Sequence, residues 1–128
     1  MENSEIWAKK TVCIIDDNDD IREIYRTKFI MEGFEVSTAV NGVEGLKVIR
    51  EKNPDIILLD IEMPVMNGLE VLAELKKDST LIKIPVVMLT NQDNEGIFKE
   101  VGKFNTRFYI IKSLATPQKV VDLVREAL

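Results

Sequence analysis

A run of four aliphatic residues between two acids constrains the fold of this chain more than any other feature. The run, Ile56 to Leu59, is preceded by Asp55 and followed by Asp60. A half-exposed strand would alternate apolar and polar residues, so an unbroken run predicts a short strand that is buried on both faces. Asp60 then lies where a buried strand ends. A carboxylate at such a position needs a cation, a metal ion or hydrogen-bond donors around it.

The rest of the chain predicts strands and helices in alternation, because apolar runs and segments of helical periodicity follow one another. We expect strands at 11–15, 34–39, 56–59, 84–89 and 107–111, and helices at 20–31, 42–52, 69–77, 93–104 and from 117 onward. This alternation predicts an α/β fold, in which right-handed crossovers place helices on both faces of a five-stranded parallel sheet. Gly96 and Gly102 weaken the helix at 93–104, since each interior glycine costs about 0.5–1 kcal/mol relative to alanine.

Helical spacing predicts which side chains face the sheet. In the first two helices these are Ile21, Ile24, Tyr25, Ile30, Val43, Leu46, Val48 and Ile49. In the third and last helices they are Leu69, Leu72, Ala73, Leu75, Val120, Val121, Leu123 and Val124. An apolar stripe on each helix, packed on the sheet, gives the expected core.

Composition is typical of a soluble protein with one domain. The chain has 128 residues, of which 45% are hydrophobic and 30% are charged, and we expect an N-terminal extension at 1–10 and one domain at 11–128. The net charge of -5 argues against nucleic acid or an anionic membrane as a partner. The lone Cys13 lies in an apolar run and is expected to be a buried, unreactive thiol. We find no signal sequence or transmembrane run and therefore expect a cytosolic protein.

Polar residues follow the expected strands at their carboxyl ends. Asp16 and Asp17 follow the first strand, Asp60 ends the third, Thr90 follows the fourth and Lys112 ends the fifth. Parallel strands bring these ends to one edge of the sheet, where ligands bind in open α/β folds. Three carboxylates beside one lysine leave excess negative charge, which a hard divalent cation such as Mg2+ complements. A metal-bound carboxylate next to a lysine and a hydroxyl can attack a phosphoryl donor and form an aspartyl phosphate.

Each of these residues has an ordinary structural explanation when it is taken alone. Asp16 and Asp17 can be turn and cap residues before a helix, and Asp60 can be a salt-bridged strand end. Thr90 can be a structural hydroxyl, and Lys112 can be a solvated charge. Their joint occurrence at one edge favours the functional interpretation, since each ordinary explanation would need its own coincidence.

The whole chain resembles the receiver domain of two-component response regulators, and in size it is most similar to stand-alone CheY-like proteins. The matching motifs are Ile15-Asp16-Asp17, Leu59-Asp60-Ile61-Glu62-Met63-Pro64 with Asn67-Gly68, Thr90 after an apolar strand, and Tyr109-Ile110-Ile111-Lys112. The resemblance implies a CheY-like, flavodoxin-like sheet with strand order 2-1-3-4-5. It also implies a signalling phosphoacceptor, not an enzyme, that assists its own phosphorylation and dephosphorylation.

The resemblance further implies how the phosphoryl group and the metal ion are bound. Asp60 would accept the phosphoryl group from a sensor histidine kinase or a phosphotransfer protein. Mg2+ would be bound by Asp17, Asp60 and the backbone carbonyl of Glu62, and Asp16 would reach it largely through water.

The same resemblance implies a switch. Thr90 and Lys112 would hold the phosphoryl oxygens, and Tyr109 would change rotamer as the switch reports its state. We expect the fourth helix, the fifth strand and the fifth helix to bind a downstream protein, because the glycine-weakened fourth helix can repack. A phosphorylation-dependent dimer is left open as well. The chain ends at Leu128, so we expect either a protein that signals by binding another protein or an excised receiver domain.

Two positions depart from the family pattern. Ser113 stands where the family commonly has a cis proline, and a cis bond before a non-proline residue costs roughly 2.5–4 kcal/mol, so the loop after it is expected to be arranged differently. Asn91 stands where a small residue is usual. We expect Asn91, with Glu62 and Gln92 flanking the site, to slow both donor access and hydrolysis.

Other protein classes match this sequence less well. A haloacid-dehalogenase-like phosphatase needs a second aspartate two residues after the nucleophile, where this chain has Glu62. A flavodoxin-like cofactor binder needs a phosphate loop after the first strand, where Asp16 and Asp17 would repel a phosphate, and P-loop and dinucleotide fingerprints are absent. The main alternative is a pseudo-receiver, an interaction module that keeps the fold without phosphorylation. The complete set of acids, hydroxyl and lysine argues against it.

Overall fold

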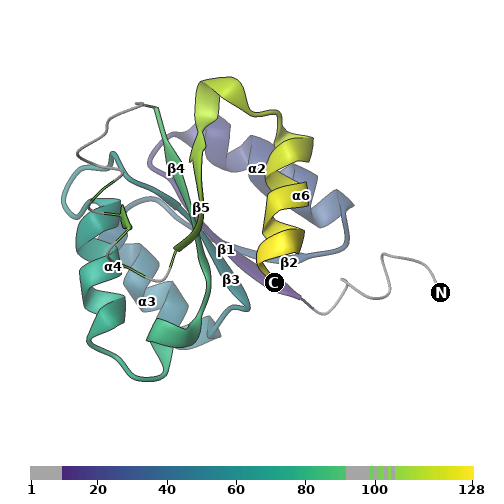
Figure 1. Cartoon of the computed structure of the whole chain (residues 1–128). Coiled ribbons are helices and arrows are strands. Elements are labelled where there is room, and N and C mark those ends of the chain that lie inside the picture. The colour runs from purple at the N-terminus through teal and green to yellow at the C-terminus, as the bar shows by residue number, and fades with distance from the viewer. Residues whose placement is uncertain (1–9, 92–98, 100, 103, 105) are drawn as a thin grey trace.

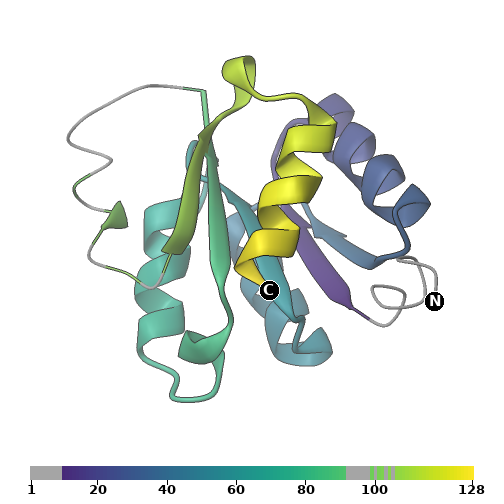
Figure 2. The ribbon, with the colours of Figure 1, turned by 45° about the vertical axis from the view of Figure 1, so that its right-hand side comes forward.

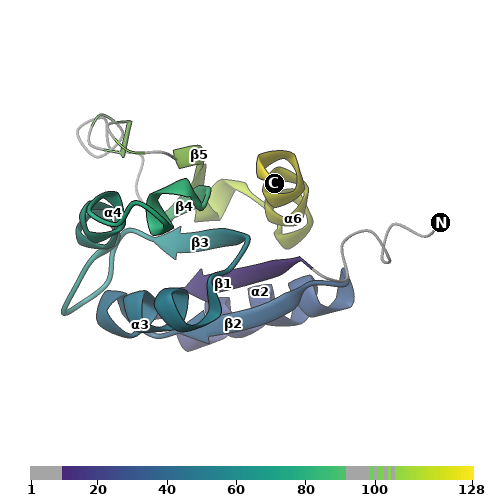
Figure 3. The same ribbon diagram turned by 90° about the horizontal axis from the view of Figure 1, so that it is seen from below.

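The structure is a computed structural model that describes residues 10–91, 99, 101, 102, 104 and 106–128. Its centre is a parallel sheet of five strands, β1 (Thr11–Ile15), β2 (Glu35–Ala39), β3 (Ile56–Asp60), β4 (Val86–Thr90) and β5 (Thr106–Ile111). The strands follow one another in the order β2-β1-β3-β4-β5 (Figure 3). The expected α/β fold class and strand order are therefore confirmed.

Helices cover both faces of this sheet. They are α2 (Asp19–Met31), α3 (Gly42–Lys52), α4 (Gly68–Lys76) and α6 (Pro117–Ala127). Helices α3 and α4 lie on one side of the sheet, and α2 and α6 lie on the other (Figure 1). Helix α6 runs beside α2 (Figure 2), and Arg125 Nη1 lies 3.1 Å from Oε1 of Glu32 at the end of α2. The expected helix at 93–104 and the N-terminal extension fall almost entirely outside the described residues.

Two single-turn 3₁₀ helices have no counterpart in the sequence-based expectations. They are η1 (Leu81–Lys83), which precedes β4, and η2 (Lys112–Leu114), which follows β5. Three residues are too few to show a periodicity, so the hydrophobic pattern does not reveal them. Within the described part of the chain, every helix is too short or too polar to cross a membrane.

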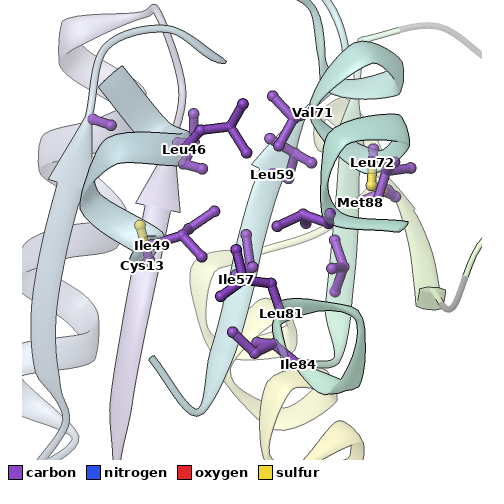
Figure 4. Packing of buried hydrophobic residues seen from close by; sticks show 14 of the residues in the cluster. Cys13, Leu46, Ile49, Ile57, Leu59, Val71, Leu72, Leu81, Ile84 and Met88 are labelled. Atoms are coloured by element: carbon purple, nitrogen blue, oxygen red, sulfur yellow. The ribbon is translucent and has the colours of Figure 1, made fainter. Parts of the chain in front are cut away.

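The side chains of β3 divide between two hydrophobic clusters, one on each face of the sheet. Ile57 and Leu59 pack with residues of α3 and α4 (Figure 4), and Ile56 and Leu58 pack with residues of α2 and α6. Successive strand residues point to opposite faces, and all five residues of β3 are buried. The prediction of a central strand buried on both faces is therefore confirmed.

The predicted apolar faces of the first two helices are wrong at three positions. Ile24 and Ile30 of α2 are 49% and 46% exposed, and Val43 of α3 is 52% exposed. The buried residues of α2 are Tyr25, as predicted, and Phe29, which was not predicted; they lie one helical turn apart on the same face. Because this aromatic pair faces the sheet, the isoleucines that flank it are turned toward solvent.

Each of the four described helices begins at a side chain that caps its amino terminus. The side-chain oxygens of Asn18, Asn41 and Asn67 accept the backbone N–H three residues further on, each at 2.9 Å. Thr116 does the same for α6 at 3.1 Å. Asn67 and Glu70 also form a reciprocal capping box. Such caps stabilise a helix by about 1 kcal/mol each, and here they fix where the helices start beyond the carboxyl ends of the strands.

The loop between β3 and α4 returns very closely to the end of β3 at Gly68. A Cβ atom at this position would lie 2.5 Å from the backbone oxygen of Asp60, so only glycine fits. The Gly68 amide donates to the Ile61 carbonyl at 2.9 Å. In the same loop Val65 has a φ of 69°, a left-handed conformation that is unfavourable for a β-branched residue.

Replacing Val65 with glycine is expected to raise the free energy of unfolding by about 0.5–1 kcal/mol. The left-handed conformation costs an L residue about 1–2 kcal/mol, and the larger entropy of glycine in the unfolded chain offsets part of that gain. The Val65 side chain is 80% exposed, so little packing is lost. Urea unfolding would measure the change. As a control, Val43→Gly at an exposed helical position should lower the free energy of unfolding, and effects of the same sign would contradict strain at Val65.

Candidate functional site

Strand pairing places Asp16 and Asp60 side by side. Ile15, the last residue of β1, pairs with Leu59 of β3, so the next residue on each chain segment is an aspartate at the same level of the sheet. Both side chains are almost fully buried. Two carboxylates brought together out of water destabilise one another unless a cation compensates their charge.

A bulge in β5 brings Lys112 to the same edge. Arg107 is an extra residue opposite β4, and it advances the ladder by one residue. Beyond the bulge, Thr90 pairs with Ile111, whereas an unbroken ladder would have paired it with Ile110. Lys112 therefore follows directly after the residue that pairs with Thr90.

Lys112 is the cation that contacts both carboxylates. Its Nζ lies 2.7 Å from Oδ2 of Asp16 and 3.3 Å from Oδ1 of Asp60, and the lysine side chain is 7% exposed. Within the described residues, these two buried oxygens have only this ammonium as a partner. One positive charge cannot neutralise two ionised carboxylates, so Lys112 can balance only one of them.

Two contacts that were not expected from the sequence fix the position of Asp16. The Asn18 amide donates to Oδ1 of Asp16 at 2.9 Å, and Nη1 of Arg22 donates to the Asp16 backbone carbonyl at 2.9 Å. Arg22 lies in the first turn of α2. Long side chains in helices point back toward the amino terminus, and this rule is the signal that could have indicated the contact of Arg22 with the site.

Burial controls the protonation of this cluster. Burial and then the charge of Asp16 raise the pKa of Asp60 from 3.8 to about 8, although Lys112 opposes the shift. Burial lowers the pKa of Lys112, but the close contact with Asp16 and the charge of Asp60 outweigh burial, so this pKa is raised. Lys112 therefore stays charged, whereas Asp60 is largely protonated at neutral pH unless a further cation is bound.

Three carboxylates at this edge form a group that suits a hard divalent cation. One oxygen atom from each of Asp16, Asp17 and Asp60 lies within 4.8 Å of the other two. Asp17 is exposed while the other two are buried, so the group is accessible from solvent. Mg2+ takes oxygen ligands and keeps several waters, and its charge would compensate the excess that one lysine leaves. The residues present therefore fit such an ion.

The side chain of Glu62 lies against the end of β4. The Thr90 hydroxyl donates to Oε1 of Glu62, and the Asn91 amide donates to Oε2 at 3.3 Å. Thr90 is buried, Glu62 is half-buried and Asn91 is exposed. Thr90 thus lies at the strand end as expected, but its contact with the Glu62 carboxylate was not predicted. Gln92 lies outside the described residues.

Tyr109 and Ser113 lie further along β5 and η2. Tyr109 pairs with Met88, and its half-buried ring packs against the hydrophobic cluster on the α3 and α4 face. All peptide bonds among the described residues are trans, so a trans bond joins Lys112 to Ser113 at the start of η2.

Comparisons with known proteins agree with this fold. A family model described as "Response regulator receiver domain" matches residues 12–125. The polar-differentiation response regulator DivK of Brucella anthropi is 35% identical over 109 residues, which are 85% of this chain and 89% of that protein. The chemotaxis protein CheY4 of Vibrio cholerae has a TM-score of 0.87 at 26% identity, covering 93% of this chain and 98% of that one. A LuxR-family DNA-binding response regulator of Staphylococcus aureus has a TM-score of 0.85 at 30% identity, with the same coverage.

Proposed function

The chain belongs to the response regulator receiver domain family, and we propose that it accepts a phosphoryl group on Asp60 from a sensor histidine kinase or a phosphotransfer protein. Receiver domains of this family are signalling modules that interact with kinases and with downstream partners. One observation carries the proposal: the buried ammonium of Lys112 contacts both Asp16 and Asp60 at the strand end next to Thr90.

In the proposed reaction Asp60 is the nucleophile. A bond forms between a carboxylate oxygen of Asp60 and phosphorus, while the bond from phosphorus to the donor breaks and its electron pair leaves with the donor. Lys112 binds one phosphoryl oxygen, and the Thr90 hydroxyl donates a hydrogen bond to another. Later attack of water on phosphorus releases inorganic phosphate and restores the Asp60 carboxylate.

We propose that Mg2+ is held by Asp17, Asp60 and the backbone carbonyl of Glu62, and that Asp16 reaches it largely through water. When bound, Mg2+ supplies positive charge that favours the ionised carboxylates and the phosphoryl oxygens. Two observations support this set. One oxygen from each of the three aspartates lies within 4.8 Å of the other two. Burial, followed by the charge of Asp16, raises the pKa of Asp60 to about 8, which makes the metal-free carboxyl a poor nucleophile.

The switch is proposed to reach the surface through β5. Lys112 follows β5 directly, and Thr90 pairs with the last residue of that strand. Tyr109 would change rotamer as Thr90 and Lys112 turn to the phosphoryl group. We propose that the segment 93–104, β5 and α6 bind a downstream protein or a second phosphorylated copy. Unchanged amide exchange at 106–112 on phosphorylation would argue against this surface.

The chemical character of the chain supports proteins as its partners. Its net charge of -5 provides no excess of cations for nucleic acid.

Cys13 is a buried free thiol, and burial raises its pKa to about 11, as expected of an unreactive structural cysteine. We therefore propose a cytoplasmic signalling protein that acts through protein contacts.

Phosphorylation of the wild type is expected to require both Mg2+ and Asp60. After incubation with acetyl phosphate, the intact mass of the wild type should show one phosphoryl adduct with Mg2+ and none without it. The Asp60→Asn variant should show none in either condition. An adduct on that variant would contradict the assignment of Asp60. If the wild type binds Mg2+ and forms no adduct, two explanations are left: a site blocked at Asn91, or a phosphorylation-independent interaction module.

We also propose that Asn91, Glu62 and Gln92 slow donor access and hydrolysis. The support is that Asn91 is exposed beside the buried Thr90 and donates its amide to Glu62. Asn91→Ala should raise both the phosphorylation and the dephosphorylation rate. Two unchanged rates would contradict this assignment of Asn91.

A further inference from the structure

The carboxylate of Glu62 already uses the Thr90 hydroxyl, which a phosphoryl group on Asp60 would need as a hydrogen-bond donor. Its Oε1 accepts a hydrogen bond from the Thr90 hydroxyl. Its Oε2 accepts a hydrogen bond from the Asn91 backbone amide, whose nitrogen lies 3.3 Å away. Glu62 lies in the loop after β3, whereas Thr90 ends β4. The two contacts therefore tie the loop that follows the proposed phosphoacceptor to the end of the neighbouring strand.

A carboxylate and a phosphoryl group cannot share these donors. A hydroxyl group and a backbone amide each have one proton to donate, so Thr90 bonded to Glu62 is not available to a phosphoryl oxygen. Hydrogen bonds to ionised acceptors are shorter and stronger than bonds between neutral groups. The Glu62 contacts are thus not displaced without a cost to the incoming group.

We propose that Glu62 is a positioning residue that occupies the Thr90 hydroxyl in the unphosphorylated site and is displaced from it when Asp60 is phosphorylated. This inference rests on the proposed function of Asp60, and it gives the Glu62 side chain a role separate from that of its backbone carbonyl. In the unphosphorylated chain, Glu62 holds Thr90 in its present position and so opposes the switch. When the phosphoryl group takes the Thr90 hydroxyl, the Glu62 side chain loses its contact with Thr90 at the end of β4.

The charge of Glu62 acts in the same direction as its hydrogen bonds. Burial and the charge of Asp16 raise the pKa of Asp60 most, and the negative charge of Glu62 adds to the shift. A phosphoryl donor therefore meets a repulsive charge as well as occupied donors. An experiment has to separate these two effects, because a charge effect alone does not require the contact with Thr90.

A double-mutant cycle on the rate of phosphorylation by acetyl phosphate and Mg2+ separates them. Glu62→Ala is expected to accelerate phosphorylation about tenfold, since a charge-assisted hydrogen bond no longer has to be displaced. In the Thr90→Val background the acceleration should fall to about threefold or less, because the contested hydroxyl is gone. The exposed Glu44 in the first turn of α3 provides a control for lost charge, and Glu44→Ala should leave the rate nearly unchanged. Equal accelerations in both backgrounds would overturn the proposal.

A second readout does not depend on phosphorylation. In the Mg2+-free, unphosphorylated protein, Glu62→Ala should move the resonance of the Asn91 backbone amide proton upfield, because its hydrogen bond to Glu62 is lost. Glu44→Ala should leave this resonance where it is. An unchanged Asn91 resonance would overturn the proposal even if the chain accepts a phosphoryl group. If the Asn91 resonance shifts but the wild type forms no phosphoryl adduct, the contact of Glu62 is supported and the proposed function of Asp60 is rejected. The two experiments therefore distinguish a failure of this inference from a failure of the proposed function.

Discussion

Replacement of Lys112 by methionine is expected to lower the free energy of unfolding by about 3 kcal/mol near neutral pH. Methionine keeps much of the apolar stem of lysine, so the change removes mainly the ammonium. Asp16 and Asp60 are then buried without the cation that contacts both. Because burial and the charge of Asp16 raise the pKa of Asp60 to about 8, Asp60 can take up a proton. The cost of burying an unpaired charge then falls mainly on Asp16. The expected loss in free energy of unfolding therefore lies near the lower end of the range seen when one partner of a buried ion pair is removed.

Urea unfolding in the presence of a chelator would measure this loss, and Lys119 offers a matched control. Lys119 is exposed on α6, and Lys119→Met should change the free energy of unfolding by less than about 0.5 kcal/mol. The effect at Lys112 should also shrink in acid, since protonated carboxylates need no cation. A loss at Lys112 no larger than the loss at Lys119 would contradict the role of the lysine as partner of two buried acids.

Asparagine at position 60 is expected to stabilise the metal-free protein, and the advantage should increase with pH. In the folded state, burial and the charge of Asp16 raise the pKa of Asp60 from 3.8 to about 8. A raised pKa means that the stability contributed by this group is fully present below about pH 4 and is lost as the pH rises to about 8. Asparagine never ionises, so the advantage of Asp60→Asn should grow by about 2 kcal/mol between about pH 6 and pH 8.

Addition of Mg2+ should reverse the order of stability at the upper end of this range. The ionised Asp60 is then compensated, whereas an amide is a weaker ligand for a hard cation. The exposed Asp20 in the first turn of α2 supplies a control, and Asp20→Asn should show no such growth with pH. A difference between wild type and Asp60→Asn that stays constant with pH would contradict the raised pKa of Asp60.

The sheet and its polar edge can be predicted from the sequence because the signals for both are local. Unbroken apolar runs such as Ile56 to Leu59 indicate strands buried on two faces, and Asp60 and Thr90 each stand at the carboxyl end of such a run. Register is a different matter. The bulge at Arg107 decides which residue of β5 pairs with Thr90, and no glycine or proline marks it in the sequence.

The direction in which individual side chains point also cannot be predicted from the sequence pattern. The spacing of aliphatic residues in α2 includes Ile24 and Ile30, but the aromatic pair fixes the buried face and leaves both isoleucines exposed. The sequence places Glu62 beside the site without showing its partner. Its contact with Thr90 depends on the path of the loop after β3, and the close return of that loop at Gly68 is a tertiary contact.

The most direct test of Asp60 as the phosphoacceptor is to locate the phosphoryl group on the chain. Borohydride reduces an acyl phosphate to an alcohol, so a phosphorylated aspartate becomes homoserine, which peptide mass mapping can assign to one position. After incubation with acetyl phosphate and Mg2+, we predict homoserine at position 60 and unchanged aspartate at Asp16 and Asp17. Homoserine at either of those positions, or its absence from position 60 in protein shown to bind Mg2+, would contradict the proposed function.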